Sequence, residues 1–539
     1  MKKLLLLAII SISTFSFAQV QDALVFLEAK NSTVVAAALA DPITVMTQAA
    51  IDRKMAQGTP IDDRDVPLNE IQKAAISAST GISVLAKSKW LNAVYVRGNK
   101  TNIDNLLNLS FVTEIEFADK SLNRPAGNKF AKDKFEIENQ LRPNYNYGSA
   151  TNQTEMINVD YLHDNGYNGE NILVAFMDNG YPGVMTNPAY ATLRDEGRLL
   201  GSYDFVERTE NPNGNGGHGA LTFSDAAGFL DGQFVGTAPN ASYYLYVTEA
   251  LDETPAEEAY WVEALERADS LGVYVTNTSL GYQAFDKSAY NHTYADLDGQ
   301  TTIAARGSNA GYDKGMINVV SAGNDAQGFG YVSTPADAPG SLTIGAVDEF
   351  EEYVYFSSYG PTSDGRIKPD VMAKGADAAV VNPYGGVSTA SGTSFSSPIT
   401  AGAVASLWSA VPNVKNEVIM QAIRESADKF TNPNNLYGYG IPDFGIALDA
   451  ILLLSTEQHM QEINFALYPN PVTTQINISF PKSAERAEFV LYNILGERIL
   501  QKNISPLKNS VDVSELSSGM YIASITSNNK TTSYKIIKQ

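Results

Sequence analysis

The chain has 539 residues, of which 44% are hydrophobic and 18% charged, and its formal net charge is -22. This length exceeds one ordinary core and predicts two to four domains, and the composition is typical of a globular chain rather than a disordered one. The acidic balance lacks the basic footprint of a nucleic-acid-binding protein, so we expect no nucleic-acid partner.

The N-terminus has the pattern of a secretory signal peptide. Lys2 and Lys3 precede the apolar run LLLLAIISISTF, and Ser16 and Ala18 are the small residues before a cleavage site. The run is too short to span a bilayer comfortably. We therefore expect residues 1–18 to be removed on export. The chain contains no cysteine, which excludes disulfides, cysteine-peptidase chemistry and thiolate zinc sites.

Residues 19–120 have mixed strand and helix patterns. The stretches DALVFLEAK, NAVYVRG and FVTEIEF are typical of strands, and NIDNLLNLS is typical of a short helix. This combination predicts a small α+β domain. The polar stretch over residues 121–155 is interpreted as a linker or exposed segment.

Between residues 156 and 454, short apolar runs alternate with helical patterns. The apolar runs include NILVAFMD, ASYYLYVTEA, GVYVTNTSLG, MINVVSAGN and SLTIGAVD, and AEEAYWVEALERADSL is amphipathic. The alternation predicts an α/β domain with a largely parallel sheet. Because ligands bind beyond the carboxyl ends of the strands in such sheets, the residues directly after these runs are the first candidates for a site.

The chain has four histidines, which narrows the search for a general base. His163, His292 and His459 have polar neighbours, and we expect them to be surface or capping residues. His218 lies in NPNGNGGHGALTFSDAAG, where the glycines let other backbone approach and leave the imidazole accessible. Taken alone, this segment fits a flexible glycine-rich loop equally well.

Two further candidates lie at the ends of apolar runs. Asp178 ends NILVAFMD, where it either caps a turn or orients an imidazole through the Nδ1–H group. Asn324 ends MINVVSAGN, and its amide fits either a turn or a hydrogen-bond donor to an oxyanion.

The stretch SGTSFSSP contains four serines, of which Ser394 directly precedes a small-residue helical pattern. A serine at the start of a helix lies near unpaired N–H groups and the positive end of the dipole, which favours charge on a substrate oxygen. The alternative is an ordinary N-cap. Pro398 prefers the first helical turn, so the helix is expected to begin close to Ser394.

Together these residues resemble the subtilisin-like serine peptidases, the subtilases. Asp178, His218 and Ser394 occur in the order that subtilisin uses, and Ser394 lacks the G-x-S-x-G motif of α/β-hydrolases. NILVAFMDNG, GGHGALTFSDAAG and SGTSFSSPITAG are similar to the family's aspartate, histidine and serine motifs, and GTAPNASYYLYVTE, NTSLGY and VVSAGND to three further family segments. Ala220 departs from the usual threonine, and DNG from the commoner D-[ST]-G; both departures concern pocket details.

The resemblance implies an acyl-transfer mechanism and its site residues. Ser394 would be the nucleophile, His218 the general base and Asp178 the carboxylate that orients it, while Asn324 and the Ser394 N–H would stabilise the oxyanion. The resemblance further implies that substrate backbone pairs as an added strand, and the expected substrate-binding residues are Ser279, Leu280, Gly281, Ala322 and Gly323. The serines at 391, 396 and 397 are then loop and packing residues.

No cofactor is expected to be required. Acidic loop residues such as Asp325 and Asp337 are available to a structural Ca²⁺ ion, but no ligand spacing in the sequence requires one, so no metal site is assigned.

Both flanking regions have resemblances of their own. The domain over 19–120 resembles the subtilase propeptide, which inhibits the peptidase and assists its folding, with an ordinary accessory domain as the alternative; the maturation site would lie in the linker. Residues 457–539 alternate apolar and polar residues, which predicts a β-sandwich. LYPNPV, LYNILGERI and SSGMYIASI in it resemble the C-terminal sorting domain of the type IX secretion system of Bacteroidetes. A carbohydrate- or protein-binding sandwich is the alternative.

We therefore expect a secreted serine endopeptidase, either released or held at the outer-membrane surface, that is a monomer. Its partners would be protein and peptide substrates, its own propeptide and the type IX secretion machinery. The alternative is a surface adhesion or binding protein with a degenerate peptidase fold. The complete set of Asp178, His218, Asn324 and Ser394 argues against that alternative.

Overall fold

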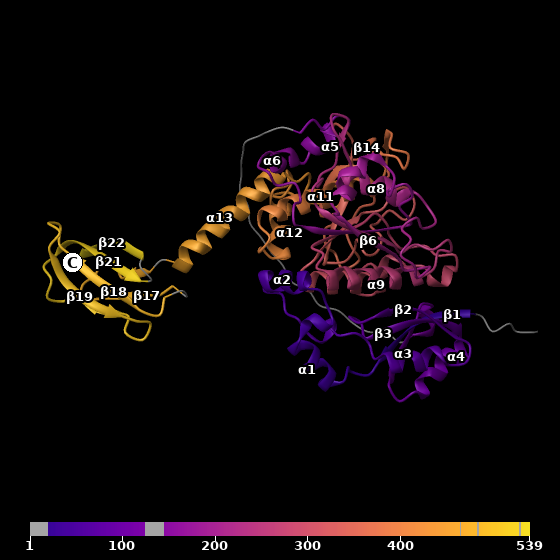
Figure 1. Ribbon diagram of the computed structural model, residues 1–539, viewed down its shortest axis with the longest axis horizontal. Helices are drawn as coiled ribbons and strands as arrows, with labels where there is room; N and C mark the ends of the chain where they lie inside the picture. Colours follow the sequence, from indigo (N-terminus) through magenta and orange to yellow (C-terminus); the bar gives the residue numbers. More distant parts are fainter. Residues whose placement is uncertain (1–19, 124–144, 464, 482–483, 528–529) are drawn as a thin grey trace, which may run out of the picture. The chain divides into compact units, whose positions relative to one another are not determined.

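A computed structural model describes residues 20–123, 145–463, 465–481, 484–527 and 530–539 (Figure 1). The expected signal peptide and most of the expected linker, with its maturation site, lie outside the described residues. The chain divides into two compact units, Met1–Asp449 and Ala450–Gln539. The first unit contains an N-terminal domain, residues 20–123, and an α/β domain, residues 145–449.

The N-terminal domain is built on a four-stranded antiparallel sheet. Its strands are β1 (Val20–Leu27), β2 (Ile82–Ser88), β3 (Ala93–Asn99) and β4 (Val112–Phe117), in the order β2-β3-β1-β4. Its helices are α1 (Ser32–Ala40), α2 (Gln48–Gln57), α3 (Glu70–Ser77) and α4 (Lys100–Asp104). The predicted α+β domain is confirmed, although β2 and the first three helices were not predicted.

Both faces of the central strand β3 are buried, which explains why it begins with the continuous apolar sequence AVYV. Successive strand residues point to opposite faces. Val94 and Val96 of β3 belong to the internal core of the N-terminal domain. Ala93 and Tyr95 of the same strand belong to a core shared with the α/β domain. The sheet therefore joins two hydrophobic cores.

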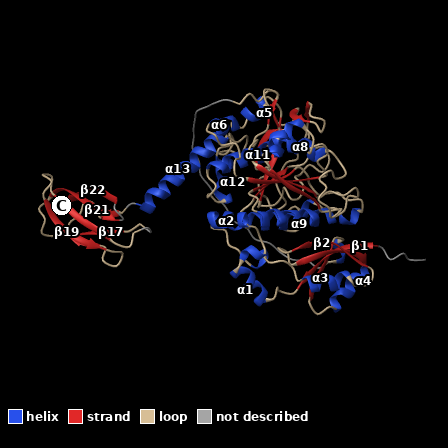
Figure 2. Ribbon diagram, in the orientation of Figure 1, coloured by secondary structure: helices blue, strands red, loops and turns tan. Residues whose placement is uncertain are grey.

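The α/β domain is built on a seven-stranded parallel sheet (Figure 2). The strand order is β13-β12-β11-β10-β5-β9-β6, and every pairing along it is parallel. The strands are β5 (Leu173–Asp178), β6 (Leu199–Asp204), β9 (Ser242–Val247), β10 (Val275–Thr278), β11 (Ile317–Ser321), β12 (Ser341–Val347) and β13 (Val371–Lys374). The predicted parallel sheet is confirmed.

Helices cover both faces of the parallel sheet. On one face lie α8 (His218–Ala227) and α11 (Thr393–Ala410), and on the other, toward the N-terminal domain, lie α9 (Ala256–Leu271) and α10 (Ile303–Asp313) (Figure 1). The other α-helices are α5 (Thr151–Glu155), α6 (Val159–Asp164), α7 (Ala191–Asp195), α12 (Asn416–Glu425) and α13 (Phe444–Ile463). Two short antiparallel pairs of strands lie outside the parallel sheet: β7 (Phe229–Leu230) with β8 (Phe234–Val235), and β14 (Ala378–Val381) with β15 (Val387–Ala390). In the described part of the chain no helix is long and apolar enough to cross a membrane.

The second unit ends in a C-terminal domain, residues 465–539, with two antiparallel sheets. One has the order β16-β17-β20 and the other β19-β18-β21-β22. The strands are β16 (Ala466–Tyr468), β17 (Gln475–Ser479), β18 (Ala487–Tyr492), β19 (Arg498–Ile504), β20 (Ser510–Asp512), β21 (Gly519–Ser527) and β22 (Lys530–Lys538). Ile476 and Val511 of the first sheet share a core with Phe489 and Ile525 of the second. The predicted β-sandwich is confirmed.

Candidate active site

The candidate residues gather at the carboxyl edge of three neighbouring parallel strands. Asp178 is the last residue of β5, Ser279 directly follows β10, and Asn324 follows β11 by three residues. In the sheet order β10 lies between β11 and β5. Parallel strands bring such residues to one edge, and the N-termini of α8 and α11 bring His218 and Ser394 there.

Asp178 and His218 form a direct pair. The imidazole Nδ1 lies 2.8 and 3.0 Å from the two carboxylate oxygens of Asp178. The carboxylate also accepts a hydrogen bond from the Asn179 N–H, at 2.8 Å, and one from the Thr222 hydroxyl, at 3.2 Å. The Asp178 side chain is 1% exposed and that of His218 is 31% exposed, so a buried carboxylate orients an accessible imidazole.

The charge of Asp178 raises the pKa of His218 above its ordinary value of 6.5. Partial burial of the imidazole acts in the opposite direction, while the hydrogen bond to Asp178 and the charge of Glu249 add to the increase. Nδ1 is occupied by the carboxylate. The arrangement therefore leaves Nε2 as the ring nitrogen that can exchange a proton with a substrate or a nucleophile.

Ser394 is the second residue of α11, which begins at Thr393, close to Ser394 as expected, although Pro398 lies inside the helix rather than in its first turn. The proline has no N–H group and cannot donate to the carbonyl of Ser394, four residues earlier. That carbonyl instead accepts a hydrogen bond from the Ser279 hydroxyl, at 2.8 Å. The sequence thus attaches the start of α11 to the segment after β10.

The Ser394 hydroxyl itself donates to the carbonyl oxygen of Ser279, at 3.3 Å. Among the described residues, the Ser394 hydroxyl is therefore bonded to Ser279 and not to His218. The rings of His218 and Phe395, the residue after Ser394, lie 6.1 Å apart between centroids. The residue after Ser394 thus lies beside the imidazole of His218.

The amide of Asn324 has a fixed orientation. Its Oδ1 accepts hydrogen bonds from the Thr393 N–H, at 2.8 Å, and from the Thr393 hydroxyl, at 3.0 Å. The amino group therefore points away from Thr393, and a Cβ at Gly392 would lie 3.3 Å from its nitrogen. Since Ser394 is in the first turn of α11, its N–H also has no partner within the helix. Two donors are thus available beside the serine.

The five expected substrate-binding residues form two segments near these donors. Leu280 is half-buried and Gly281 is exposed, whereas Ala322 is buried and Gly323 is half-buried. Gly323 has a φ of +108°, which favours glycine, and its N–H donates to the Thr393 hydroxyl at 3.1 Å. Ser279 is buried and holds α11 rather than facing solvent.

A half-buried acidic group lies beside the site and was not predicted from the sequence. Glu249, two residues after β9, accepts hydrogen bonds from the hydroxyls of Tyr282, at 2.8 Å, and Thr248, at 2.9 Å. Burial raises the pKa of Glu249 to about 7 and that of Glu257 to about 9. Isolated glutamates in a polar stretch carry no sequence signal for such an environment.

The expectation that His163 and His292 are surface or capping residues is wrong. His163 is 5% exposed, bonded to the Tyr147 hydroxyl and the Thr237 carbonyl, and burial lowers its pKa to about 4. His292 is 6% exposed and lies 2.7 Å from Glu258. The polar residues that neighbour each histidine in the sequence therefore did not indicate that the histidine itself is buried. The side chain of His459 lies outside the described residues.

The two acidic residues considered for calcium have other roles in the described structure. Asp325 accepts a hydrogen bond from the Phe329 N–H, at 2.8 Å, and caps a turn. Asp337 is buried, accepts from the Gly299 N–H and has a pKa raised by burial to about 6. Within the described ranges, no group of three or more His, Cys, Asp or Glu side chains is placed to hold a metal ion.

Three family models match the chain. The model described as the subtilase family matches residues 169–440, that of the peptidase S8 propeptide domain of Bacteroidota matches residues 22–134, and that of a secretion system C-terminal sorting domain matches residues 466–539. The N-terminal domain is thus a propeptide domain. The C-terminal match indicates secretion to the extracellular space or the outer-membrane surface.

Curated relatives are peptidases at modest identity. The chain is 28% identical over 349 residues to the thermophilic serine proteinase of Bacillus sp. (strain AK1), covering 63% of this chain and 77% of that protein. It is 26% identical over 377 residues to subtilisin E of Bacillus subtilis (strain 168), covering 69% and 88%. It is 27% identical over 296 residues to the subtilisin-like protease SBT6.1 of Arabidopsis thaliana, covering 53% of this chain and only 26% of the plant protein.

Among solved structures, the MycP3 protease from the type VII (ESX-3) secretion system is 21% identical to the chain. The match covers 58% of this chain and 92% of that one, with a TM-score of 0.46.

Proposed function

Because the chain belongs to the subtilase family, the subtilisin-like serine peptidases, we propose that it is a secreted endopeptidase that acts through Asp178, His218 and Ser394. The observation that carries this proposal is the 2.8 Å contact between His218 Nδ1 and the buried carboxylate of Asp178. A histidine held in this way presents Nε2 as a general base. Ser394 holds the position of the nucleophile in the segment SGTSFSSPITAG, which is similar to the family's serine motif.

The proposed reaction is acyl transfer. The Ser394 hydroxyl leaves the carbonyl of Ser279, attacks the scissile carbonyl carbon and gives its proton to His218 Nε2. The negative charge that forms on the carbonyl oxygen is stabilised by the amide of Asn324 and the Ser394 N–H. His218 then protonates the leaving amine, which leaves the acyl group on Ser394. In the second stage water attacks this acyl group and gives its proton to His218, and His218 returns a proton to the Ser394 oxygen as the acid product leaves.

Substrate chains are proposed to lie along Leu280 and Gly281 as an added strand. The backbone of Tyr282 is not available for this pairing, because its N–H donates to the Thr334 carbonyl at 2.8 Å. Gly281 is exposed and has no side chain, so substrate backbone can approach it closely. Extended protein and peptide segments are therefore the proposed substrates, and the type IX secretion machinery the partner of the C-terminal domain.

The position of Ser333 bears on which substrate residue the peptidase accepts directly before the scissile bond. A Cβ at Gly281 would overlap the Ser333 hydroxyl oxygen, and a Cβ at Gly323 would lie 3.5 Å from the same atom. The hydroxyl thus fills space between the two substrate-binding segments. We propose that the peptidase prefers a small side chain there, with alanine cleaved faster than phenylalanine.

The variant Ser333→Gly tests this preference. Removing the hydroxymethyl group should raise kcat/KM for phenylalanine relative to alanine by about tenfold or more, the range found for one side-chain carbon in a pocket. Paired fluorogenic peptides that differ only at this residue provide the measurement. An unchanged ratio would place Ser333 outside the pocket.

The test of the function itself is hydrolysis of a peptide library by the mature protein. Ser394→Ala should abolish cleavage, whereas Ser391→Ala, in the loop before the helix, should keep it. Equal activity of the Ser394→Ala variant would rule out the proposal. Absence of cleavage by the unsubstituted mature protein would favour the adhesion alternative.

A further inference from the structure

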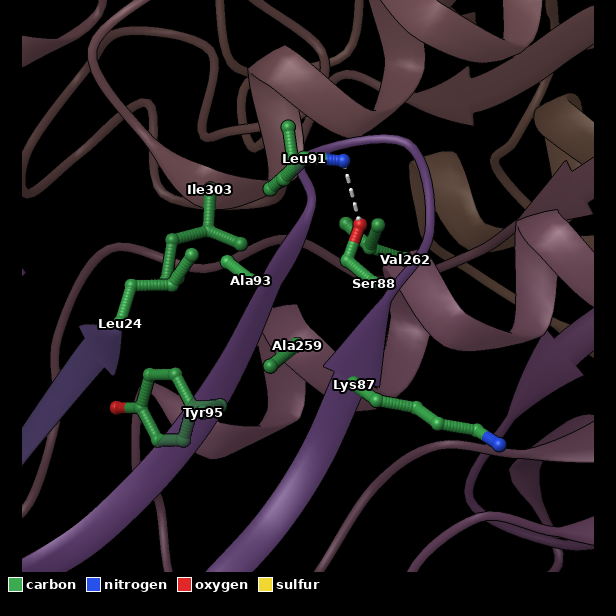
Figure 3. Close-up of a pocket in the computed structure, with 9 residues that line it drawn as sticks. All are labelled: Leu24, Lys87, Ser88, Leu91, Ala93, Tyr95, Ala259, Val262 and Ile303. Carbon is green, nitrogen blue, oxygen red and sulfur yellow. Dashed lines mark hydrogen bonds between the residues drawn. The ribbon is translucent and has the colours of Figure 1, made fainter. Parts of the chain in front are cut away.

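Two parts of the N-terminal domain contact the α/β domain. The first contact is made by the sheet. Residues of both domains line a small cavity of about 10 Å³: Leu24, Ala93 and Tyr95 come from the N-terminal domain, and Ala259, Val262 and Ile303 from the α/β domain (Figure 3). This contact has an apolar centre, and polar groups adjoin it: Glu266 of α9 accepts hydrogen bonds from the Ser88 hydroxyl and the Trp90 N–H. The second is made by α2, which belongs to a helical segment of residues 28–69 inserted between β1 and α3.

The α2 contact is shaped by two glycines at the ends of α9 and α10. Gly272 ends α9 with a φ of +91°, and a Cβ there would come within 2.8 Å of the Ala49 and Ala50 backbone. Gly315 follows α10 with a φ of +86°, and a Cβ there would come within 2.7 Å of the Thr59 hydroxyl. The helix ends and α2 therefore approach to a distance that other residues would not allow.

Charges that are fully buried join α2 to the end of α9. The Asp269 carboxylate of α9 lies 2.5 Å from the guanidinium of Arg53 and 2.7 Å from the ammonium of Lys54, and all three side chains are 0% exposed. Arg53 also donates to the carbonyls of Val273, at 2.5 Å, and Lys314, at 3.0 Å. Two consecutive cations of the N-terminal domain thus share one anion of the α/β domain.

A second pairing runs in the opposite direction. The ammonium of Lys314, from the α/β domain, is buried and lies 2.7 Å from both Asp65 and Asp62 of the N-terminal domain. Lys54 is 3.5 Å from Asp65 and links the two pairings. Each domain therefore offers cations to the anions of the other, and separating the domains breaks both pairings.

The two contacts meet at Ser270 of α9. Its carbonyl accepts a hydrogen bond from the Thr47 N–H, at 2.9 Å, and its hydroxyl accepts one from the Lys89 ammonium, at 2.5 Å. Beside this junction lies a cavity of about 380 Å³, with walls from the inserted segment (Val45, Pro67 and Leu68), from β2 and its turn (Lys87 and Lys89) and from the α/β domain (Tyr203, Phe205, Glu263, Glu266, Arg267 and Ser270). Buried ion pairs add little net stability compared with apolar packing, but loss of one partner is strongly destabilising. Such a contact discriminates between matching and non-matching partners.

We propose that residues 47–66 form a second attachment site that recognises this chain's own α/β domain through Asp269 and Lys314. It holds the N-terminal domain in place after the chain between the two domains is cut, and thereby delays activity. Only one part of the proposal rests on the proposed function: that peptidase activity rises when the N-terminal domain dissociates. The attachment itself is a property of the uncut chain.

The attachment is tested by hydrogen exchange on the full-length chain carrying Ser394→Ala, which keeps one uncut species and needs no activity. Lys54→Ala should speed exchange at least tenfold in α2 and in residues 269–274, and leave β1 and β3 unchanged. Asp65→Asn, which keeps the size of the side chain, should do the same. Lys100→Ala is the matched control, because Lys100 is half-exposed and its partners, Asp104 and the ring of Phe117, belong to the same domain.

Release is measured on the cut chain with Ser394 present. Gel filtration should show the Lys54→Ala N-terminal domain dissociating at least tenfold faster than the unsubstituted one, with peptidase activity rising in step. The Lys54→Ala chain and the unsubstituted chain have the same α/β domain, because the substitution lies in the N-terminal domain. Equal final peptidase activity of the two therefore shows that the α/β domain of the variant folded. Undisturbed α2 exchange, or simultaneous exposure of α2 and the sheet, would overturn the proposal. Failure of activity alone would instead contradict the proposed function.

Discussion

At the scale of single residues, the motif order predicted the pair of Asp178 and His218, and the structure brings the two within 2.8 Å. The roles of these residues remain the proposal argued above. The sequence did not indicate Thr222, which donates to the second oxygen of Asp178 one helical turn after His218. It also gave no sign of Glu249, because a pattern of residue types does not report which carboxylates become buried.

Replacement of Asn324 by leucine tests the oxyanion donor. The variant should lose roughly 100- to 1000-fold in kcat with little change in KM, because the donor acts on charge that is present only in the transition state. Steady-state kinetics on one peptide provide the measurement. A rise in KM at constant kcat would show that Asn324 binds the substrate instead.

The pH profile tests the environment of His218. A general base must be neutral, and Asp178 raises the pKa of His218, so the acidic limb of kcat/KM should have its midpoint above pH 6.5. Glu249→Gln should move this midpoint slightly to lower pH, since Glu249, with a pKa of about 7, carries part of its charge there and that charge favours the imidazolium. Glu253→Gln is the control, and a midpoint below pH 6.5 in the unsubstituted protein would contradict the assignment.

At the scale of elements, the small-residue pattern of α11 predicted a central helix, but not what its residues contact. Gly402 packs against the Thr237 side chain and the Ala238 backbone. Pro398 frees the Ser394 carbonyl for Ser279. Both contacts join segments more than 100 residues apart, and local sequence does not specify them. Edge strand β6 was missed for a related reason: it is short, half-buried and interrupted by a register shift near Gly201.

Gly402→Ala tests the close packing of α11. Alanine normally stabilises a helix by about 1 kcal/mol relative to glycine. Here the added methyl group would overlap the Thr237 hydroxyl, so we expect a loss of about 1–3 kcal/mol in the free energy of unfolding. Denaturant unfolding measures the sign. Ser409→Ala, near the exposed end of the same helix, should change little, and a stabilised Gly402→Ala variant would refute the packing argument.

At the scale of the whole molecule, pattern changes along the chain predicted the α+β, α/β and β-sandwich folds, because each fold has its own period of apolar residues. The burial of both faces of β3 and the charge pairing of α2 were beyond sequence reasoning. They depend on which surfaces of the two domains meet. The C-terminal domain has a core of its own, formed by residues from 465 onward.

Removal of residues 465–539 tests the role of the C-terminal domain. The shortened chain should remain cell-associated while the extracted protein keeps its peptidase activity, because the described core of the α/β domain does not use these residues. Fractionation into medium and cells, with activity measured in each, gives the result. Normal amounts of the shortened chain in the medium would show that export does not need this domain.

The most direct test of the central claim is to treat the mature protein with a fluorophosphonate probe and map the adduct by mass spectrometry. Only an activated serine displaces the fluoride, so the account predicts one adduct, on Ser394, that is lost in Ser394→Ala and kept in Ser396→Ala. No adduct on the mature protein, or an adduct undiminished in Ser394→Ala, would contradict it.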